Sequence, residues 1–400
     1  MQMNNLVYLD YHATTPVDPR VLEAMLPYFS NRFGNPASLH GYGAAAKEAV
    51  EEARASIAHA IGVDPREIIF TSGATESNNL AIFGVTQSPR CRGKHVVSVA
   101  TEHRAVLDPL KRLAQKGFEI TLLPVRPWNE AEAGLLDLEQ FAAALRTDTC
   151  LVSVMLANNE IGVIQPIAEI GRLCSERGIP FHCDATQAVG KLPIRLKELN
   201  VDLMSFSAHK LYGPKGIGGL YVRQSNRQLR LEPLIWGGGH ENGLRSGTLN
   251  VPAIVGFARA IEICLAELPH EAERLRRLRD LFFRKLWQEI GDVHLNGPAL
   301  DRTELRLANN LNVSFPYLEA ESLLLSAPDL AASPGSACSS STPGPSHVLQ
   351  ALGLPEHLLR GGIRFGLGRF TTEDDIDKAV GILWEAVRRL RAFAGLGMRK

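Results

Sequence analysis

The sequence lacks an excess of charge of either sign and has no long hydrophobic run. Its 43 basic residues balance 43 acidic residues, so the formal net charge at pH 7 is zero. This balance gives no global electrostatic attraction to nucleic acid or to an anionic membrane surface. No apolar stretch reaches the length of a membrane span, and the first residues show no basic region followed by an apolar core. We therefore expect no direct nucleic-acid partner, no membrane partner and no signal peptide.

The sequence is also poor in cysteine, and its cysteines do not form metal or redox motifs. None of the six belongs to a C-x-x-C pair or has zinc-finger spacing; they are Cys91, Cys150, Cys174, Cys183, Cys264 and Cys338. Most lie in apolar runs, as small core residues do. This usage predicts a reduced protein of the cytoplasm.

What the sequence does contain is a regular alternation of apolar runs and helical patterns from about residue 67 to 223. Examples are "EIIF" before "TSGATESNNLAIFG" and "KHVVSVA" before "TEHRAVLDPLKRLAQKG". The alternation predicts an α/β fold with a mostly parallel sheet between helices. Such sheets bind ligands beyond the carboxyl ends of their strands. Polar residues follow the predicted strands there: Thr75, Glu102, His103, Asn158, Asn159, Asp184, Gln187, Ser207, His209 and Lys210.

The pattern changes after about residue 260, where a charged amphipathic helix is followed by a strand–helix pair. The segment 330–347 is dense in Ser, Gly and Pro and is interpreted as a loop. We predict a large domain over 16–260 and a smaller α+β domain made of 1–15 and 261–400, which carries this loop.

A candidate anion site follows the first of these predicted strands. In "FTSGATESNNLAI" a strand ends at Thr71, Gly73 allows a tight turn, and a helix starts near Thr75. Free amide groups and the helix dipole favour an anion such as phosphate at such a start. The alternative is an ordinary helix capped by Thr75, and the motif alone favours that alternative.

Asp184 and Lys210 end neighbouring predicted strands, in "FHCDATQAVG" and "SFSAHKLYGP". Asp184 could cap the next helix or pair with the protonated ring nitrogen of pyridoxal phosphate (PLP). A lysine at the closed end of an apolar strand suits Schiff-base chemistry, because burial lowers its pKa and makes the amine nucleophilic. His103 could stack on the ring, although a single histidine is more often structural.

These residues carry a resemblance that runs nearly the whole length of the chain. The motifs include "YLDYHATTPVDPRV", "FTSGATESNNLAI", "TEHRAVLD", "DATQAVGKLPI", "SFSAHKLYGP", "GLRSGT", "GSACSSS" and "IRFGLGRFTTEDDID". In order and spacing the chain resembles cysteine desulfurases of the NifS/IscS type, which are class V aminotransferase-like PLP enzymes of fold-type I.

The resemblance implies a role for each matching residue. Lys210 would bind PLP covalently, Asp184 would pair with the ring nitrogen, and Gln187 would hydrogen-bond the ring hydroxyl. His103 would stack on the ring and act as an acid and base. The phosphate would be bound by Ala74, Thr75, Ser207 and His209, and by Thr248 of the partner subunit, which implies a homodimer with shared active sites. Asn159 would contact cofactor and substrate, and Arg364 would bind the substrate carboxylate.

Cys338 differs from the other cysteines because it lies among small and turn-forming residues in "SPGSACSSSTPGPS". The sequence predicts an exposed, mobile segment, and the alternative is a stray surface cysteine. The resemblance implies that its thiolate takes sulfur from L-cysteine, leaving L-alanine and an enzyme persulfide. An acceptor such as an iron–sulfur scaffold would then receive the sulfur. A transient iron–sulfur cluster shared with that scaffold would make Cys338 a metal ligand as well.

The chain departs from the family pattern at a few positions. Pro334 replaces a small polar residue and is expected to stiffen the entry to the loop, Gly366 replaces a serine, and the ending "GLGMRK" has no extended tail. These differences bear on the choice of partner. Two other interpretations stay open: a fold-type I aminotransferase or lyase that does not use Cys338, and a non-enzymatic sulfur or iron–sulfur carrier.

Overall fold

The computed structural model describes residues 6–226, 229–334 and 344–395. Its largest sheet has the strand order β2-β8-β7-β6-β5-β3-β4. Only β8 runs against the others, since it pairs antiparallel with both β2 and β7 while β7, β6, β5, β3 and β4 pair in parallel. The predicted α/β class with a mostly parallel sheet is confirmed. The strands are β2 Ile68–Thr71, β3 His95–Val99, β4 Glu119–Leu123, β5 Thr149–Ser153, β6 Phe181–Asp184, β7 Leu203–Ser207 and β8 Gly218–Val222.

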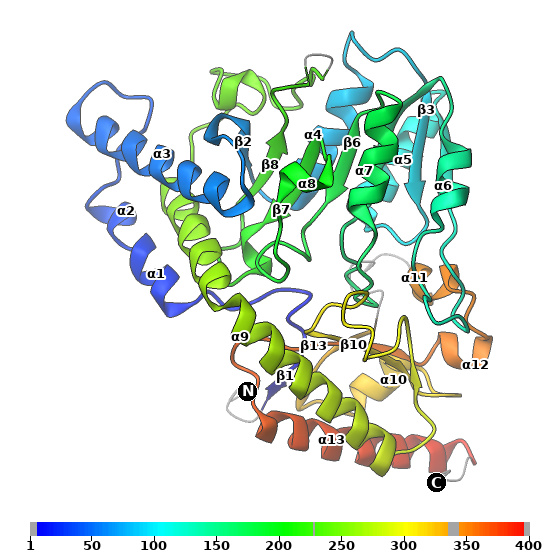
Figure 1. The fold of residues 1–400 in the computed structure, drawn as a ribbon. Helices are drawn as coiled ribbons and strands as arrows, with labels where there is room; N and C mark the ends of the chain where they lie inside the picture. The colour runs from blue at the N-terminus through cyan, green and yellow to red at the C-terminus, as the bar shows by residue number, and fades with distance from the viewer. Residues whose placement is uncertain (1–5, 227–228, 335–343, 396–400) are drawn as a thin grey trace.

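Helices cover both faces of this sheet (Figure 1). Successive residues of one strand face opposite cores: Val96 belongs to the core that includes α4 and α5, whereas Val97 belongs to the core that includes α3, α7 and α9. A sheet covered on both faces needs near-continuous apolar strands, which explains the runs in the sequence. The helices of this part are α1 Pro19–Met25, α2 Pro27–Ser30, α3 Gly41–Ile61, α4 Ala74–Thr86, α5 Arg104–Gln115, α6 Leu138–Ala144, α7 Ile167–Glu176 and α8 Leu196–Leu199.

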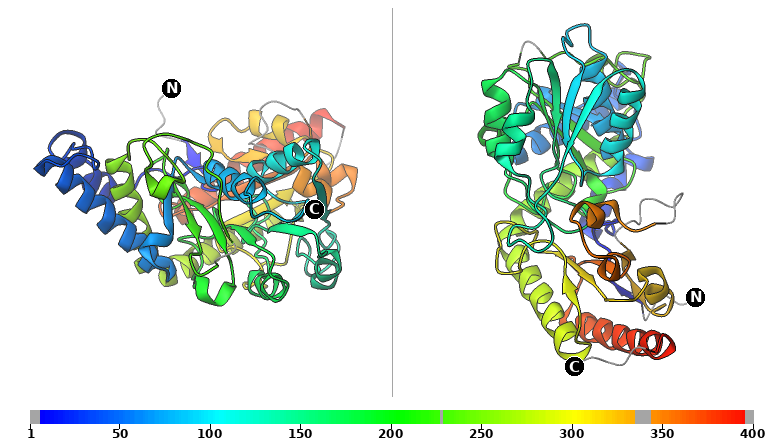
Figure 2. Two further views of the ribbon diagram at one scale, coloured as in Figure 1. Left: turned by 90° about the horizontal axis from the view of Figure 1, so that it is seen from above. Right: turned by 90° about the vertical axis from the view of Figure 1, so that its right-hand side faces the viewer.

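A second, smaller sheet has the order β12-β13-β10-β9 and is antiparallel throughout. It packs with α13 and the second half of α9 in a separate apolar core (Figure 2). The N-terminal strand β1 joins this core by pairing with β11. The strands are β1 Val7–Tyr8, β9 His294–Leu295, β10 Asn310–Ser314, β11 Leu330–Ala331, β12 Ser333–Pro334 and β13 Gly362–Gly366, and the helices are α9 Val251–Glu289, α10 Ala320–Leu325, α11 His347–Ala351, α12 Glu356–Leu359 and α13 Glu373–Phe393.

The long helix α9 connects the two sheets. Its first half packs against α3 and its second half runs beside α13 (Figure 1). The predicted change of pattern near residue 260 therefore falls inside one continuous helix rather than in a linker. The division of the chain into 16–260 and 1–15 with 261–400 stays a prediction.

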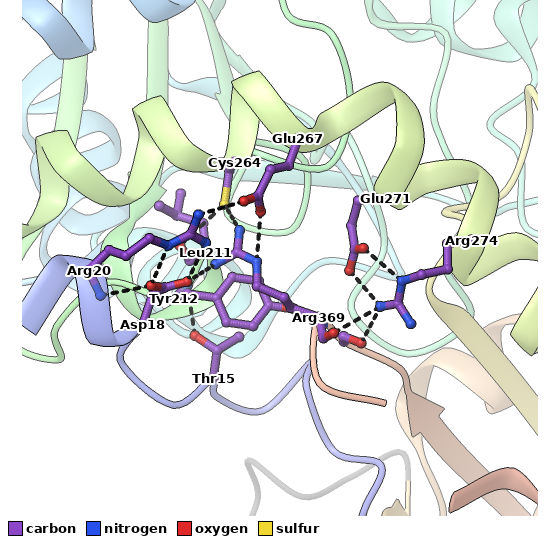
Figure 3. A network of polar contacts seen from close by, with 11 residues as sticks. Thr15, Asp18, Arg20, Leu211, Tyr212, Cys264, Glu267, Glu271, Arg274 and Arg369 are labelled. Atoms are coloured by element: carbon purple, nitrogen blue, oxygen red, sulfur yellow. Dashed lines mark hydrogen bonds and ion pairs between the residues drawn. The ribbon is translucent and has the colours of Figure 1, made fainter. Parts of the chain in front are cut away.

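A network of polar contacts joins α9 to its neighbours, since Glu267 on this helix pairs with Arg20 and Arg369 (Figure 3). Arg369, just after β13, lies 2.6 Å from the Asp18 carboxylate and stacks over the ring of Tyr212. Asp18 also accepts hydrogen bonds from Arg20, which chiefly lower its pKa to about 2. Since Tyr212 follows Lys210 by two residues, this cluster supports the loop that carries the lysine.

We predict that Arg369→Met lowers the free energy of unfolding by about 2 kcal/mol. The side chains of Arg369 and Asp18 are only 11% and 2% exposed, so the variant leaves a buried carboxylate with Arg20 as its remaining partner. The urea midpoint measures the effect. Arg66→Met is the matched control, because the Arg66–Asp64 pair is largely exposed, at 76% and 42%, and should contribute little. Equal midpoints for the two variants would contradict the prediction.

Candidate active site

A cavity of about 490 Å³ lies at the carboxyl ends of β2, β5, β6 and β7. It is the place that the sequence predicts for a ligand. Most of the predicted site residues line it: Ala74, Thr75, His103, Asn159, Asp184, Gln187, Ser207, His209, Lys210 and Arg364. The structure thus brings together residues that are far apart in the sequence.

Lys210 ends a short 3-10 helix, Ala208–Lys210, directly after β7. Its ammonium nitrogen donates to the carbonyl oxygens of His12 and Ala13, at 2.7 and 2.6 Å. These carbonyls belong to the N-terminal segment that crosses below the large sheet. The lysine is half-buried, and the two carbonyl oxygens stabilise its ammonium charge. Its amine lies at the wall of the cavity, where it could reach the aldehyde of a ligand.

Asp184 is the last residue of β6 and is buried. Its Oδ2 accepts from Asn78 Nδ2 at 2.7 Å, and its Oδ1 accepts from the backbone and hydroxyl of Thr186. The chain continues as a turn rather than as the regular helix that the capping alternative requires. A buried carboxylate with neutral hydrogen-bond donors but no ion pair within the described residues is well suited to hold a cationic ring nitrogen.

The start of α4 forms the candidate anion site. Gly73 precedes it with a positive φ of 153°, which L side chains rarely adopt, and among the described residues no side chain caps the helix. The expectation that Thr75 caps α4 is wrong, because the helix already begins at Ala74. Ser207 and His209 lie on the other side of the same cavity. Burial and nearby lysines lower the pKa of His209 to about 4, so at neutral pH its ring is neutral and can donate from one nitrogen.

His103 is both a helix cap and a cavity residue. Its Nδ1 accepts from the backbone amide of Ala105 at 3.0 Å, at the start of α5. The histidine follows the end of β3 by a short turn rather than ending the strand itself. The structural interpretation is therefore correct, and the same contact fixes the ring at the cavity edge.

Arg364 reaches the cavity from the second sheet, on β13. Its guanidinium lies 2.8 Å from Asp10 and donates to the backbone oxygen of Asn159. The Arg364 Nε and the Asn159 Oδ1 are buried polar atoms that have no hydrogen-bond partner among the described residues. Unpaired buried polar atoms on a cavity wall indicate that a polar ligand completes them.

Gly366, where the sequence departs from the family pattern, has a packing reason. A Cβ atom there would lie 2.7 Å from the backbone nitrogen of His12, so a larger residue would push the N-terminal segment away. That segment carries Asp10, His12 and Ala13, which contact Arg364, Gln187 and Lys210. The glycine therefore permits a close approach that shapes the cavity wall.

The sequence analysis missed His12 and Asn78, which line the cavity, and Lys191, which contacts the predicted residue Gln187. Gln187 Oε1 is 2.6 Å from the Lys191 ammonium and 3.0 Å from His12 Nδ1, and its Nε2 donates to the His12 backbone. Burial, with Lys210 nearby, lowers the pKa of Lys191 to about 7. Asn78 sits one helical turn after Ala74, a spacing that could have placed it beside the cavity. No sequence signal identifies His12, since its contact depends on the packing of the two sheets.

Among the described residues, the predicted site residue Thr248 does not line the cavity, nor do Glu102 and Asn158 from the predicted strand ends. Thr248 is exposed and lies outside the cavity. Cys338 lies outside the described residues. The chain before that segment is the edge strand β12, which ends at Pro334, where a proline is tolerated. After it, His347 Nε2 contacts the backbone oxygen of Glu102, next to His103.

The fold and the cavity define an enzyme of the class-V aminotransferase type, and residues 7–379 match the family Aminotransferase class-V. The chain is 52% identical over 392 residues to cysteine desulfurase IscS of Anaeromyxobacter dehalogenans, covering 98% of this chain and 94% of that relative. It is 50% identical over 399 residues to cysteine desulfurase IscS of Rickettsia rickettsii, covering 99% and 95%.

Solved structures give the same result. A structure titled NifS-like protein matches with a TM-score of 0.86 and 39% identity over 97% of this chain and 100% of that one. One titled SspA in complex with cysteine matches with a TM-score of 0.79 and 38% identity over 91% and 99%. The chain belongs to the cysteine desulfurase family of IscS and NifS proteins. Members of this family are PLP enzymes, so the resemblance seen in the sequence is confirmed.

None of the helices in the described residues is long and apolar enough to cross a membrane. Nor do those residues contain a group of three or more His, Cys, Asp or Glu side chains that could hold a metal ion.

Proposed function

We propose that this cysteine desulfurase uses PLP to remove sulfur from L-cysteine, giving L-alanine and a persulfide on Cys338. The observation that carries the proposal is one cavity in which Lys210, Asp184 and Arg364 meet, in a chain of this family. These groups suit an aldehyde, a cationic ring nitrogen and a carboxylate. A structural relative is described in its title as a complex with cysteine, which supports the substrate.

The residues present fit PLP. The uncapped start of α4 offers backbone amides and a helix dipole to a phosphate, with Ser207 and His209 opposite. Lys210 and Lys215 add positive charge to the same cavity. The unpaired Asn159 Oδ1 and Arg364 Nε leave hydrogen-bonding capacity for the ring substituents and the substrate.

When bound, PLP supplies an electron sink for the substrate carbons. Lys210 would bind its aldehyde, Asp184 would hold the ring-nitrogen proton, and Gln187 would donate to the ring hydroxyl. The Lys191 and His12 contacts orient the Gln187 amide, because its oxygen faces them. His103, fixed by Ala105, would cover the ring and hold a proton at Nε2. Arg364 would bind the substrate carboxylate.

Cys338 would then act as the sulfur acceptor. Its thiolate attacks the sulfur of the substrate, an S–S bond forms, and the carbon–sulfur bond breaks with its electron pair left on carbon. A proton returned to that carbon completes L-alanine. Only a thiolate is nucleophilic enough for this step, so a base or cation beside the loop is needed. His103 is one such group.

We propose a homodimer with shared sites as the working form. Large apolar side chains are exposed along α1, α2 and the start of α3 and on a loop before α9: Leu22, Leu26, Phe29, Phe33, Leu39, Tyr42 and Trp236. A patch of this kind is typical of a protein interface. A second copy covering it would bring Thr248 to a neighbouring cavity. We expect the enzyme in the cytoplasm, since the described cysteines are free thiols.

The acceptor of the sulfur is proposed to be a scaffold for iron–sulfur clusters or another sulfur carrier, with Cys338 as a transient cluster ligand. The aminotransferase or lyase alternative shares the cavity and differs only in not needing Cys338. The non-enzymatic carrier needs no cofactor. A yellow protein with a visible absorption band on purification would support a PLP enzyme, whereas a colourless one would favour the carrier.

We predict that Asp184→Asn lowers turnover by about 10²-fold while PLP stays bound. The amide cannot hold a positive charge on the ring nitrogen, but the phosphate site and Lys210 are unchanged. Alanine release and the visible spectrum measure the two effects. Asp137→Asn is the matched control, since Asp137 accepts from two backbone amides as the cap of α6, away from the cavity. Asp184 would be no more than a turn-stabilising residue if both variants kept the wild-type rate.

A further inference from the structure

A second cavity, of about 850 Å³, lies at the opposite edge of the large sheet. It is lined by the segments that lead into β3, β5 and β6, so it faces the amino ends of the parallel strands. Arg90, Arg92, Arg146, Arg177 and Arg230 surround it and give its walls a positive character. Two cysteines, Cys91 and Cys150, also line it.

The two cysteines are brought together by an irregularity in the sheet. His95 pairs with Thr149 and Val96 pairs with Leu151, so Cys150 is an extra, unpaired residue in β5. A bulge of this kind re-aims the side chain of the extra residue. Its thiol donates to the backbone oxygen of His95 at 3.3 Å.

Cys91 approaches from the loop before β3. Its thiol donates to Gly93 O at 3.4 Å. Gly93 is required there, because a Cβ would lie 2.0 Å from the backbone oxygen of Asp148. This close approach holds the Cys91 loop against the entry to β5, so the two thiols, which donate to carbonyl oxygens only two residues apart, line the same cavity.

The pair is asymmetric in a way that suits a redox couple. The neighbouring Cys150 thiol lowers the pKa of Cys91, whereas the Cys91 thiol and burial raise the pKa of Cys150. Cys91 is also partly exposed, whereas Cys150 is only 8% exposed. The other described cysteines, Cys174, Cys183 and Cys264, are buried, and burial raises the pKa of each.

We propose that Cys91 and Cys150 form a dithiol redox site, separate from the PLP cavity, that closes to a disulfide when it reacts with hydrogen peroxide. Cys91 is the attacking thiol and Cys150 is the resolving thiol. The site needs neither the cofactor nor Cys338.

The reaction balances in two steps. The Cys91 thiolate attacks one oxygen of the peroxide, an S–O bond forms and the O–O bond breaks, and the departing hydroxide takes a proton to become water. The sulfur is now a sulfenic acid, oxidised by two electrons. The Cys150 sulfur attacks it, an S–S bond forms and the S–O bond breaks. The second hydroxide leaves with the Cys150 proton as water.

The disulfide would connect the segment after α4 to the start of β5. Both segments lie at the edge of the sheet away from Lys210 and Asp184, so oxidation should leave the cofactor in place. Because the link joins residues far apart in the sequence, it restricts the unfolded chain and should raise the thermal unfolding midpoint.

The test uses the full-length holoenzyme. Protein treated with hydrogen peroxide is alkylated, digested without reductant and analysed by mass spectrometry. We expect a cross-linked pair of peptides carrying Cys91 and Cys150, which dithiothreitol removes. Before oxidation, iodoacetamide should modify Cys91 at least about tenfold faster than Cys174. The cross-link should persist in Cys338→Ser, which excludes a contribution from the loop cysteine.

Cys91→Ser and Cys150→Ser should each abolish the cross-link, and Cys174→Ser, which alters a buried thiol away from the cavity, should retain it. In Cys150→Ser, dimedone should label Cys91 as a sulfenic acid that can no longer be resolved. Should Cys150→Ser fail to fold, the wild-type and Cys91→Ser results still decide the question. Further oxidation of Cys91 to the sulfinic acid without a cross-link, or pairing of Cys91 with another cysteine, would overturn the proposal.

Discussion

Lys210→Ala is expected to remove the visible absorption band of the purified enzyme and to lower alanine release by at least about 10⁴-fold. The lysine is the amine that the geometry presents to the cavity from the end of β7. Its contacts with the backbone oxygens of His12 and Ala13 fix where the nitrogen lies. Alanine removes the nucleophile but leaves the phosphate site and Asp184 intact, so PLP should bind more weakly and without a covalent bond.

Lys215→Ala is the matched control for this variant. Lys215 lines the same cavity and carries the same charge, but its position is exposed. It should keep the absorption band and most of the activity. Borohydride reduction of the wild type followed by peptide mapping should attach the cofactor to Lys210. Attachment to Lys191 or Lys215, or a Lys210→Ala variant with normal colour and turnover, would show that the assignment is wrong.

Much of this cavity could be predicted from the sequence, because many of its residues are placed by the strand or turn that directly precedes them. Asp184, Ser207 and Lys210 each follow an apolar strand directly, and parallel strands present their carboxyl ends at one edge. The glycine-containing turn before α4 is equally local. The expected helix cap was wrong by two residues, since Gly73 rather than Thr75 precedes the helix and leaves its amides open.

The remaining features depend on contacts between distant segments, which the sequence does not encode locally. The Arg364–Asp10 pair requires that β13 and the N-terminal segment pack together. Gly366 permits this packing because it has no Cβ atom to collide with the backbone of His12. The placement of Cys91 and Cys150 on one cavity depends on a bulge in β5, and no turn residue in the sequence indicates that bulge. Spacing rules for cysteines find C-x-x-C motifs but not pairs assembled by a sheet.

Cys338→Ser should separate the two chemistries that a PLP cavity can support. The hydroxyl of serine is close in size to the thiol, but it stays protonated at neutral pH and cannot hold sulfur as a stable persulfide. The described residues that line the cavity belong to other segments of the chain and are unchanged in this variant. The variant should therefore bind PLP as the wild type does. It should also still bind L-cysteine, because Arg364 and Lys210 are unchanged.

The variant should therefore show a shifted absorption band on adding L-cysteine, while alanine release falls to near background. Cys264→Ser is the control, since that thiol is buried on α9 and burial raises its pKa to about 11. Mass spectrometry of the wild type after L-cysteine alone should find one added sulfur atom on the peptide that carries Cys338. Normal alanine release from Cys338→Ser would mean that the loop cysteine is not the acceptor and that the enzyme is a lyase. Added sulfur on Cys91 or Cys150 instead would move the transfer chemistry to the opposite edge of the sheet.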